Sequence, residues 1–216
     1  VSPERNRIYA LAGALGMFLP VGILFLVFFL DNKVHSKEYI QRITNIPFLG
    51  NIPEHKQTER RIVVKKSSRS STAEMFRLLR TNINYNASGE EYQTLLVTSS
   101  ISGEGKSFVT ANLGASFALS GKKTLLLGLD LRKPKLSLFF RETKDQKGLT
   151  NFLVGEIESL EELIQPVEGF DNLFYVDCGP MPPNPSELLM SQKLRKAIHD
   201  LKQEYDRIVM DSAPVG

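Results

Sequence analysis

The stretch VTSSISGEGKSFVTANLG, Val97 to Gly114, decides the fold that we predict for this chain. An apolar run leads into a turn of small residues, and a helix-like pattern follows Lys106 and Ser107. Glycines in such a turn let backbone N–H groups converge on phosphate oxygens, while the lysine reaches the phosphates and the hydroxyl holds Mg²⁺. The stretch therefore predicts a phosphate-binding loop. The residues expected to contact the nucleotide are Ser102, Gly103, Glu104, Gly105, Lys106, Ser107 and Phe108.

Two later segments favour this interpretation over a glycine-rich turn with an incidental lysine, although Ser100 replaces the usual first glycine of the motif. Each is an apolar strand pattern followed by a carboxylate: LLLGLDLR contains Asp130, and IVMDSAP contains Asp211. Parallel strands bring their carboxyl ends to one edge of a sheet, where ligands of open α/β sheets bind. Mg²⁺ prefers oxygen ligands. We therefore expect Ser107, Asp130 and Asp211 to hold the metal.

Strand-like and helix-like segments alternate from residue 71 onward. Strands are predicted at 94–98, 124–129, 173–176 and 207–210, and helices from 71 and at 106–119, 160–165 and 185–204. Nearly all-apolar strands in this alternation are typical of an α/β domain whose mostly parallel sheet has helices on both faces. The predicted fold class is a P-loop NTPase-like α/β domain. Because the chain stops at Gly216, directly after a strand pattern, we expect a domain truncated at its C-terminus.

The uncharged run from Ile8 to Leu30 predicts a transmembrane helix. At about 1.5 Å per residue it is long enough to cross a hydrocarbon core. A signal peptide would have a shorter apolar region, and a buried core helix rarely runs so far without a polar residue. The lone Cys178 fits a reducing compartment, so we expect a cytosolic domain. A net charge of +3 with scattered basic residues gives little support to nucleic-acid binding.

The segment after this run contains two Ile-Pro pairs, which disfavour helix and predict an extended linker. Three domains follow from these patterns. They are a transmembrane helix with a short flank at residues 1–30, a juxtamembrane linker at 31–70, and a P-loop domain at 71–216.

The P-loop domain is predicted to open with a helix, because Ser71 and Glu74 have the spacing of a capping box. On that helix Glu74, Arg77 and Arg80 share one face, opposite Phe76, and form an exposed ionic stripe. The stripe is either a solvated helix face or a contact surface.

The motifs taken together resemble those of bacterial tyrosine kinases, the BY-kinases. GEGKS is similar to their Walker A motif, DLRKP to Walker A′, and DSAP to Walker B. Glu74, Arg77 and Arg80 match the family's oligomerisation motif, and GPMPPNPSELLMS resembles its Pro-Asn-Pro loop. ITNIPFLGNIP is similar to the membrane-proximal segment. The apolar run resembles the last membrane helix of a chain-length-determinant (polysaccharide co-polymerase) domain.

The resemblance implies a membrane-anchored protein-tyrosine kinase that uses ATP and Mg²⁺, phosphorylates itself, and regulates exopolysaccharide or capsule polymerisation and export. Lys106, Asp130 and Asp211 would be catalytic, and Arg132 would also contact the nucleotide. The resemblance further implies a ring-like homo-oligomer built through the Glu74 helix, at the bacterial inner membrane with the kinase domain in the cytoplasm. Its partners would be the polysaccharide export and polymerisation machinery and the membrane.

Two other functions stay open on the sequence. Gly128 stands where the family's Walker A′ motif usually has its first aspartate, so Asp130 is the acidic residue left in that motif. This departure favours a nucleotide-gated assembly scaffold with little or no kinase activity. A partition-type P-loop ATPase is the other candidate, and the transmembrane run disfavours it.

Overall fold

The structure is a computed structural model that describes residues 4–31, 37–53, 62–86, 92–140 and 147–215. Its contacts divide the chain into two compact units, Val1–Phe48 and Leu49–Gly216. The first unit carries helices α1 (Arg5–Leu30) and α2 (Lys37–Ile43), and the second carries all the other elements. The domain boundaries expected after residues 30 and 70 stay predictions.

Helix α1 includes the whole apolar run predicted from the sequence, with Pro20 inside it. An 18-residue window within its Arg7–Leu30 segment has a mean hydropathy of 2.4, and none of that window is buried within the protein. Among the described residues, it is the one helix long and apolar enough to cross a membrane.

Five strands of the second unit form one sheet in the order β1-β5-β2-β4-β3. Their bounds are β1 (Thr94–Val97), β2 (Thr124–Gly128), β3 (Gln165–Pro166), β4 (Leu173–Val176) and β5 (Arg207–Asp211). Four strands run parallel, and the short edge strand β3 is antiparallel to β4. The register pairs both Val97 and Gly128 with Asp211, so three strands end at the same edge. The mostly parallel sheet confirms the predicted fold class.

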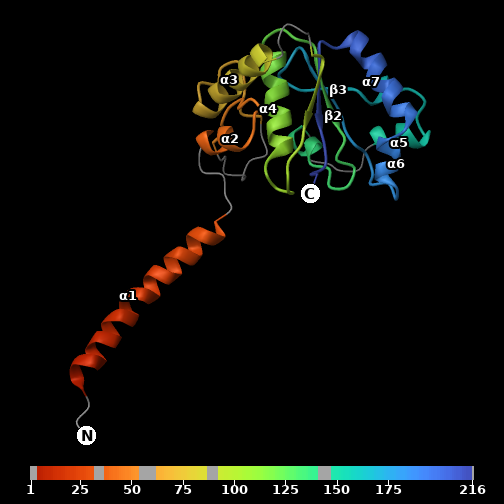
Figure 1. The fold of residues 1–216 in the computed structure, drawn as a ribbon. Helices are drawn as coiled ribbons and strands as arrows, with labels where there is room; N and C mark the ends of the chain where they lie inside the picture. Colours follow the sequence, from red (N-terminus) through yellow and green to blue (C-terminus); the bar gives the residue numbers. More distant parts are fainter. Residues whose placement is uncertain (1–3, 32–36, 54–61, 87–91, 141–146, 216) are drawn as a thin grey trace. The chain divides into compact units, whose positions relative to one another are not determined.

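Helices cover both faces of this sheet, as its all-apolar strands require (Figure 1). Leu126 of β2 packs into one hydrophobic cluster with helices α3 (Ser71–Asn86) and α4 (Lys106–Ala118). Leu125 and Leu127, which point to the other face, pack with α5 (Leu149–Val154) and α7 (Gln192–Glu204). Alternate residues of one strand therefore supply two separate cores.

The structure differs from the predicted elements in three places. The helix predicted at 185–204 is two helices, α6 (Pro185–Leu189) and α7, because the Ser191 hydroxyl accepts the Leu194 N–H at 3.2 Å and starts a new helix. The segment 160–165 holds only the short 3₁₀ helix η2 (Glu161–Leu163) followed by the start of β3. Helices α5 and η1 (Leu136–Phe139) were not predicted.

Helix α3 begins at Ser71, but the capping box predicted there is wrong. The side chain that caps the helix belongs to Ser70, whose Oγ accepts the Ala73 N–H at 3.2 Å. Glu74 is ion-paired with Arg77 rather than bonded back to the helix start. The cap therefore lies one residue earlier than the sequence pattern indicated.

Candidate functional site

The loop between β1 and α4 has the backbone that a phosphate site requires. Gly103 and Gly105 adopt left-handed conformations, with φ of +98° and +90°, and Gly105 is the N-cap residue of α4. A β-carbon at either glycine would meet no atom within 4 Å, so the loop borders open space. Ser102, Gly103 and Glu104 are exposed. The first N–H groups of α4 have no partner within the helix and are available to an anion.

Lys106 and Glu104 are both engaged within this loop. Lys106 is the first residue of α4 and only 9% exposed, and its Nζ donates to Ser99 Oγ at 2.9 Å. The Glu104 carboxylate accepts the backbone N–H groups of Ser100 and Ile101 at 3.0 and 3.2 Å. Among the described residues, one neutral hydroxyl holds the lysine at the loop, and a phosphate can replace it as the partner of Nζ.

Ser107 and Asp211, which lie far apart in the sequence, meet at the sheet edge. Ser107 Oγ donates to Asp211 Oδ2 at 2.6 Å. Asp211 is 1% exposed, and its Oδ1 is buried without a hydrogen bond of good geometry to the described residues, although the Thr110 hydroxyl lies nearby. Burial raises the pKa of Asp211 to about 6, and the charge of Asp130 adds to this rise, whereas Ser107, Lys106 and Thr110 oppose it.

These residues fit a magnesium ion. The donors are a hydroxyl and carboxylate oxygens, which are the ligands that Mg²⁺ prefers, and the orphaned Asp211 Oδ1 still has the capacity to accept a partner. No group of three or more acidic, histidine or cysteine side chains in the described ranges forms a closed metal cage. Such a site suits Mg²⁺, because this ion keeps several waters and substrate phosphates among its ligands.

Asp130 lies beside Asp211, as expected from the strand ends. The Leu129 N–H donates to the Asp211 carbonyl at 2.8 Å, which joins the two segments. Asp130 Oδ1 accepts the backbone N–H groups of Arg132 and Lys133 at 3.3 and 3.0 Å and closes the turn after β2. Among the residues that the structure describes, none hydrogen-bonds to Oδ2, so one carboxylate oxygen remains for chemistry.

The other two residues predicted to bind nucleotide have contacts elsewhere. Arg132 is exposed, and its guanidinium lies 3.4 Å from Ser186 Oγ at the start of α6. The Phe108 ring packs in the core against the rings of Phe76 and Phe139, with centroids 5.6 and 6.3 Å away. Any contact of Phe108 with a nucleotide would therefore come from its backbone. The predicted nucleotide and metal contacts stay predictions.

Comparison with known proteins agrees with this geometry. Residues 95–211 match the CbiA family model, described as the CobQ/CobB/MinD/ParA nucleotide binding domain. The putative tyrosine-protein kinase CapB of Staphylococcus aureus is 34% identical over 161 residues, which cover 74% of this chain and 69% of CapB. The chain belongs to the bacterial tyrosine-kinase family. Tyrosine-protein kinase YwqD of Bacillus subtilis is 35% identical over 158 residues, 73% of this chain and 65% of YwqD.

A solved structure also resembles this bacterial tyrosine-kinase chain. The crystal structure of the chimerical protein CapA2B2 is 30% identical to it with a TM-score of 0.75, and the match covers 84% of this chain and 76% of the other. The chain spans about two thirds of the length of YwqD and CapB. The family predicted from the motifs is confirmed, and the nucleotide-binding class of its central domain follows from the family match.

Gly128, the departure from the kinase family's Walker A′ motif, is tightly enclosed. It is the last residue of β2, and a β-carbon there would lie 3.2 Å from the Cys178 backbone nitrogen and 3.5 Å from the Val176 carbonyl oxygen. A side chain at this position would require the end of β4 to shift by a few tenths of an ångström. The β2 and β4 backbones are therefore packed for glycine at this position.

Asp177 is an acidic residue at this edge that we did not select from the sequence. It directly follows the apolar strand β4, the same signal that selected Asp130 and Asp211. Its Oδ1 accepts the Cys178 backbone N–H at 2.7 Å and lies 3.2 Å from Cys178 Sγ. Burial, with the charge of Asp177, raises the pKa of Cys178, so this thiol stays protonated and is a poor nucleophile.

A cavity of about 380 Å³ lies between residues 132–138 and 177–181.

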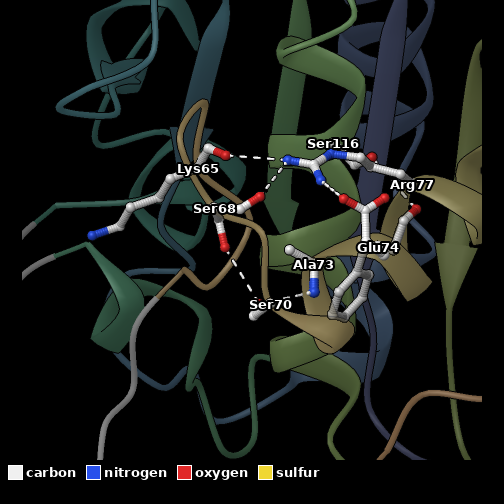
Figure 2. A network of polar contacts seen from close by, with 8 residues as sticks. Lys65, Ser68, Ser70, Ala73, Glu74, Arg77 and Ser116 are labelled. Atoms are coloured by element: carbon white, nitrogen blue, oxygen red, sulfur yellow. Dashed lines mark hydrogen bonds and ion pairs between the residues drawn. The ribbon is translucent and has the colours of Figure 1, made fainter.

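The stripe of Glu74, Arg77 and Arg80 on α3 is only partly exposed, whereas the sequence predicted a fully exposed stripe. The Glu74 side chain is 56% exposed and ion-paired with Arg77. Arg77 also donates to the Ser68 carbonyl at 2.9 Å (Figure 2). Arg80 is half-buried and donates to the Ser116 carbonyl on α4 at 2.6 Å. Both arginines therefore bind backbone within the subunit, because their carbonyl partners lie alongside α3.

The raised pKa of Asp211 gives a prediction for the ligand-free protein. Below about pH 4 the carboxyl is protonated in both the folded and the unfolded state, and its burial costs no ionisation. Between about pH 4 and 6 the unfolded state ionises this carboxyl, whereas burial keeps it protonated in the folded state. Stability is therefore lost as the pH rises toward about 6, by up to about 3 kcal/mol.

Asp211→Asn keeps the shape of the side chain but cannot ionise. We expect the free energy of unfolding of the variant to gain on that of the wild type between about pH 4 and pH 8, measured by denaturant titration without nucleotide or Mg²⁺. If the free energies of unfolding of the two proteins changed in parallel with pH, the raised pKa of Asp211 would be contradicted.

Proposed function

We propose that this chain is the ATP-dependent, autophosphorylating tyrosine-kinase part of a membrane protein that regulates exopolysaccharide or capsule polymerisation and export. The observation that carries the proposal is the bond between Ser107 Oγ and Asp211 Oδ2 at 2.6 Å, next to Lys106 at the start of α4. This arrangement joins a phosphate-loop hydroxyl to the acidic end of a distant strand. Membership of the bacterial tyrosine-kinase family supports tyrosine as the acceptor.

The residues at the edge have separate tasks in phosphoryl transfer, which is catalysed mainly by positioning and charge neutralisation. Lys106 and the N-terminus of α4 bind the phosphates of ATP. Ser107 and Asp211 would hold Mg²⁺, directly or through water, with Asp130 beside them. When bound, Mg²⁺ neutralises charge on the β- and γ-phosphate oxygens.

Asp130 is the residue proposed to act on the acceptor. The tyrosine oxygen forms a bond to the γ-phosphorus while the bond to the β–γ bridging oxygen breaks and ADP leaves. Asp130 Oδ2 orients the hydroxyl and takes its proton, because Oδ1 is already engaged by two backbone N–H groups. The cavity between residues 132–138 and 177–181, whose lining begins two residues after Asp130, would have room for an acceptor segment.

The location and partners are part of the same proposal. Helix α1 is long and apolar enough to span a membrane, which supports an inner-membrane anchor with the P-loop unit in the cytoplasm. The Glu74, Arg77 and Arg80 helix would join copies of the chain into a ring-like oligomer. The polysaccharide export and polymerisation machinery would be the heterologous partner.

Gly128 favours the alternative function, a nucleotide-gated scaffold with little or no kinase activity. Mass spectrometry distinguishes a kinase from such a scaffold. The intact membrane protein, purified in detergent, is incubated with Mg²⁺ and ATP, and phosphotyrosine is mapped. We expect phosphate on tyrosine in the wild type and none in an Asp130→Asn variant that still binds nucleotide. Tight Mg²⁺-ATP binding without any phosphotyrosine would identify the scaffold instead.

Asp211→Asn tests the metal role separately from the fold. The variant removes one negative charge from the expected metal shell, so nucleotide affinity should fall by about tenfold or more with Mg²⁺ and by less than about threefold with a chelator present. Isothermal titration calorimetry under both conditions gives the two ratios. Equal losses with and without Mg²⁺ would count against Asp211 as a ligand.

A further inference from the structure

One end of residues 62–68, which we call the strap, is held by Asn112 of α4, the helix that begins at the phosphate loop. The backbone N–H groups of Val63 and Val64 both donate to Asn112 Oδ1 on α4, at 2.7 and 3.2 Å. Ile62 and Val64 are buried in the hydrophobic cluster that contains α3 and α4. The strap precedes α3 in the sequence and packs against α4, the helix that begins at the phosphate loop.

Asn112 is fully buried, and its side-chain oxygen depends on the strap for its hydrogen bonds. Oδ1 accepts both strap N–H groups, and Nδ2 donates to the Phe108 carbonyl at 2.9 Å. A buried amide is costly unless its polar atoms are paired. If the strap left, Oδ1 would lose both partners, and the two strap N–H groups would lose theirs. The docked strap and α4 therefore stabilise each other.

The same amide reaches back to the first turn of α4. Phe108, whose carbonyl binds Asn112 Nδ2, directly follows Ser107, and its ring packs against Phe76 of α3. Lys106 and Ser107 begin this turn and are the residues proposed to bind the phosphates and Mg²⁺. Whatever fixes the first turn of α4 also fixes the orientation of the amide that holds the strap.

The far end of the strap is held independently of Asn112. Arg77 of α3 reaches the carbonyl oxygens of Ser68 at 2.9 Å and Lys65 at 3.4 Å (Figure 2). The Ser68 hydroxyl lies 3.3 Å from that of Ser70, which caps α3. Figure 2 shows these contacts converging on the turn before α3. Because α3 anchors this end, loss of the Asn112 bonds would free the 62–64 part without unfolding the helix.

We propose that Asn112 is a positioning residue that couples docking of the strap to nucleotide binding at the phosphate loop. Nucleotide bound by Lys106 and Ser107 stabilises the docked strap, and release of the strap weakens nucleotide binding by the same factor, because coupling between two sites is reciprocal. The inference rests on the nucleotide binding in the proposed function and does not require phosphoryl transfer.

Hydrogen exchange and nucleotide affinity measure the two sides of this coupling. The full chain in detergent is titrated with a hydrolysis-resistant ATP analogue and Mg²⁺, and exchange is followed in a peptide that spans residues 62–68. In the wild type we expect saturating nucleotide to slow that exchange by about fivefold or more. Asn112→Ala should abolish this slowing and weaken nucleotide affinity by about fivefold or more.

Ser116→Ala is the matched control on α4. Ser116 is also buried, one helical turn after Asn112, but its hydroxyl is directed to the Phe76 carbonyl rather than to the strap. The control should keep both the wild-type affinity and the nucleotide-dependent protection. If truncating any buried polar residue on α4 had the same structural effect, Asn112→Ala and Ser116→Ala would change nucleotide affinity and strap exchange alike.

Val64→Ala tests the coupling from the strap side and serves where Asn112→Ala does not fold. Val64 is fully buried, and its substitution changes no residue of α4. Val167→Ala is the control, because it removes the same methyl groups from another position in the same hydrophobic cluster. We expect Val64→Ala, and not Val167→Ala, to lower nucleotide affinity.

Three results bear on the proposal in different ways. Unchanged affinity in folded Asn112→Ala and Val64→Ala would overturn the coupling, and so would strap exchange in the wild type that nucleotide does not alter. If the wild type bound no nucleotide, the proposed function would fail together with this inference. Binding without coupling would overturn the inference alone.

Discussion

Lys106→Met is expected to weaken ATP binding by about a hundredfold or more while the protein stays folded. Lys106 is 9% exposed, and within the part of the chain that the structure describes its Nζ has one hydrogen-bond partner, the Ser99 hydroxyl. Bonds between a charged donor and phosphate oxygens are among the strong ones, and about 3 kcal/mol of lost interaction corresponds to about a hundredfold in affinity. Methionine keeps the length and apolar stem of lysine, so packing at the start of α4 is retained.

The measurement is binding of a fluorescent ATP analogue to the full chain in detergent, with circular dichroism and thermal unfolding to verify the fold. Lys196→Met on α7 is the matched control, because this exposed lysine belongs to a helix on the other face of the sheet. The control should bind like the wild type. If the Lys106 variant also bound like the wild type, the loop would not be a phosphate site.

The four parallel strands of this fold could be predicted because their signal is local, whereas the two-residue edge strand β3 could not. An apolar run such as TLLLG has few alternatives to a buried parallel strand, and β2 is indeed buried along its whole length. The same signal placed Asp130 and Asp211 at strand ends. Applied without exception it would also have selected Asp177, which follows β4.

Helix boundaries were less predictable, because neighbouring residues can perform the same task. Ser70 and Ser71 could each cap α3, and burial of Ala73 and Phe76 decides which serine faces the first free N–H groups. Ser191 interrupts the helix pattern at 185–204 through one hydrogen bond to Leu194, which the pattern does not show. Local sequence restricts a boundary to about two residues, and packing selects between them.

The contacts that join distant segments could not be predicted from the sequence. Within VTANLG nothing distinguishes Asn112 from a polar residue on a solvated face, because its partners Val63 and Val64 lie 49 and 48 residues away. The bond from Arg80 to the Ser116 carbonyl has the same character, with a separation of 36 residues. Such roles depend on which helices become neighbours.

These bonds within the subunit change what substitutions of Glu74, Arg77 and Arg80 on α3 can test. Replacing Glu74, Arg77 and Arg80 together with alanine removes bonds from Arg77 to the Ser68 carbonyl and from Arg80 to the Ser116 carbonyl. A hydrogen bond from a charged group contributes about 1.5–3 kcal/mol, so the triple variant should be measurably less stable even as a monomer. Loss of assembly in that variant would thus have two explanations.

Glu74→Ala separates them. Its carboxylate is 56% exposed and pairs with Arg77, so within one subunit its loss should change the free energy of unfolding by well under about 1 kcal/mol. At an interface between copies the same carboxylate would be desolvated beside partner groups, and its loss should weaken association by about 2 kcal/mol or more. We therefore expect Glu74→Ala to stay folded and bind ATP, yet sediment as smaller species in detergent and lose phosphorylation between subunits. Glu158→Ala, at an exposed carboxylate outside α3, should sediment like the wild type. Identical oligomer distributions for Glu74→Ala and the wild type would make the stripe a solvated helix face whose arginines serve only their own subunit.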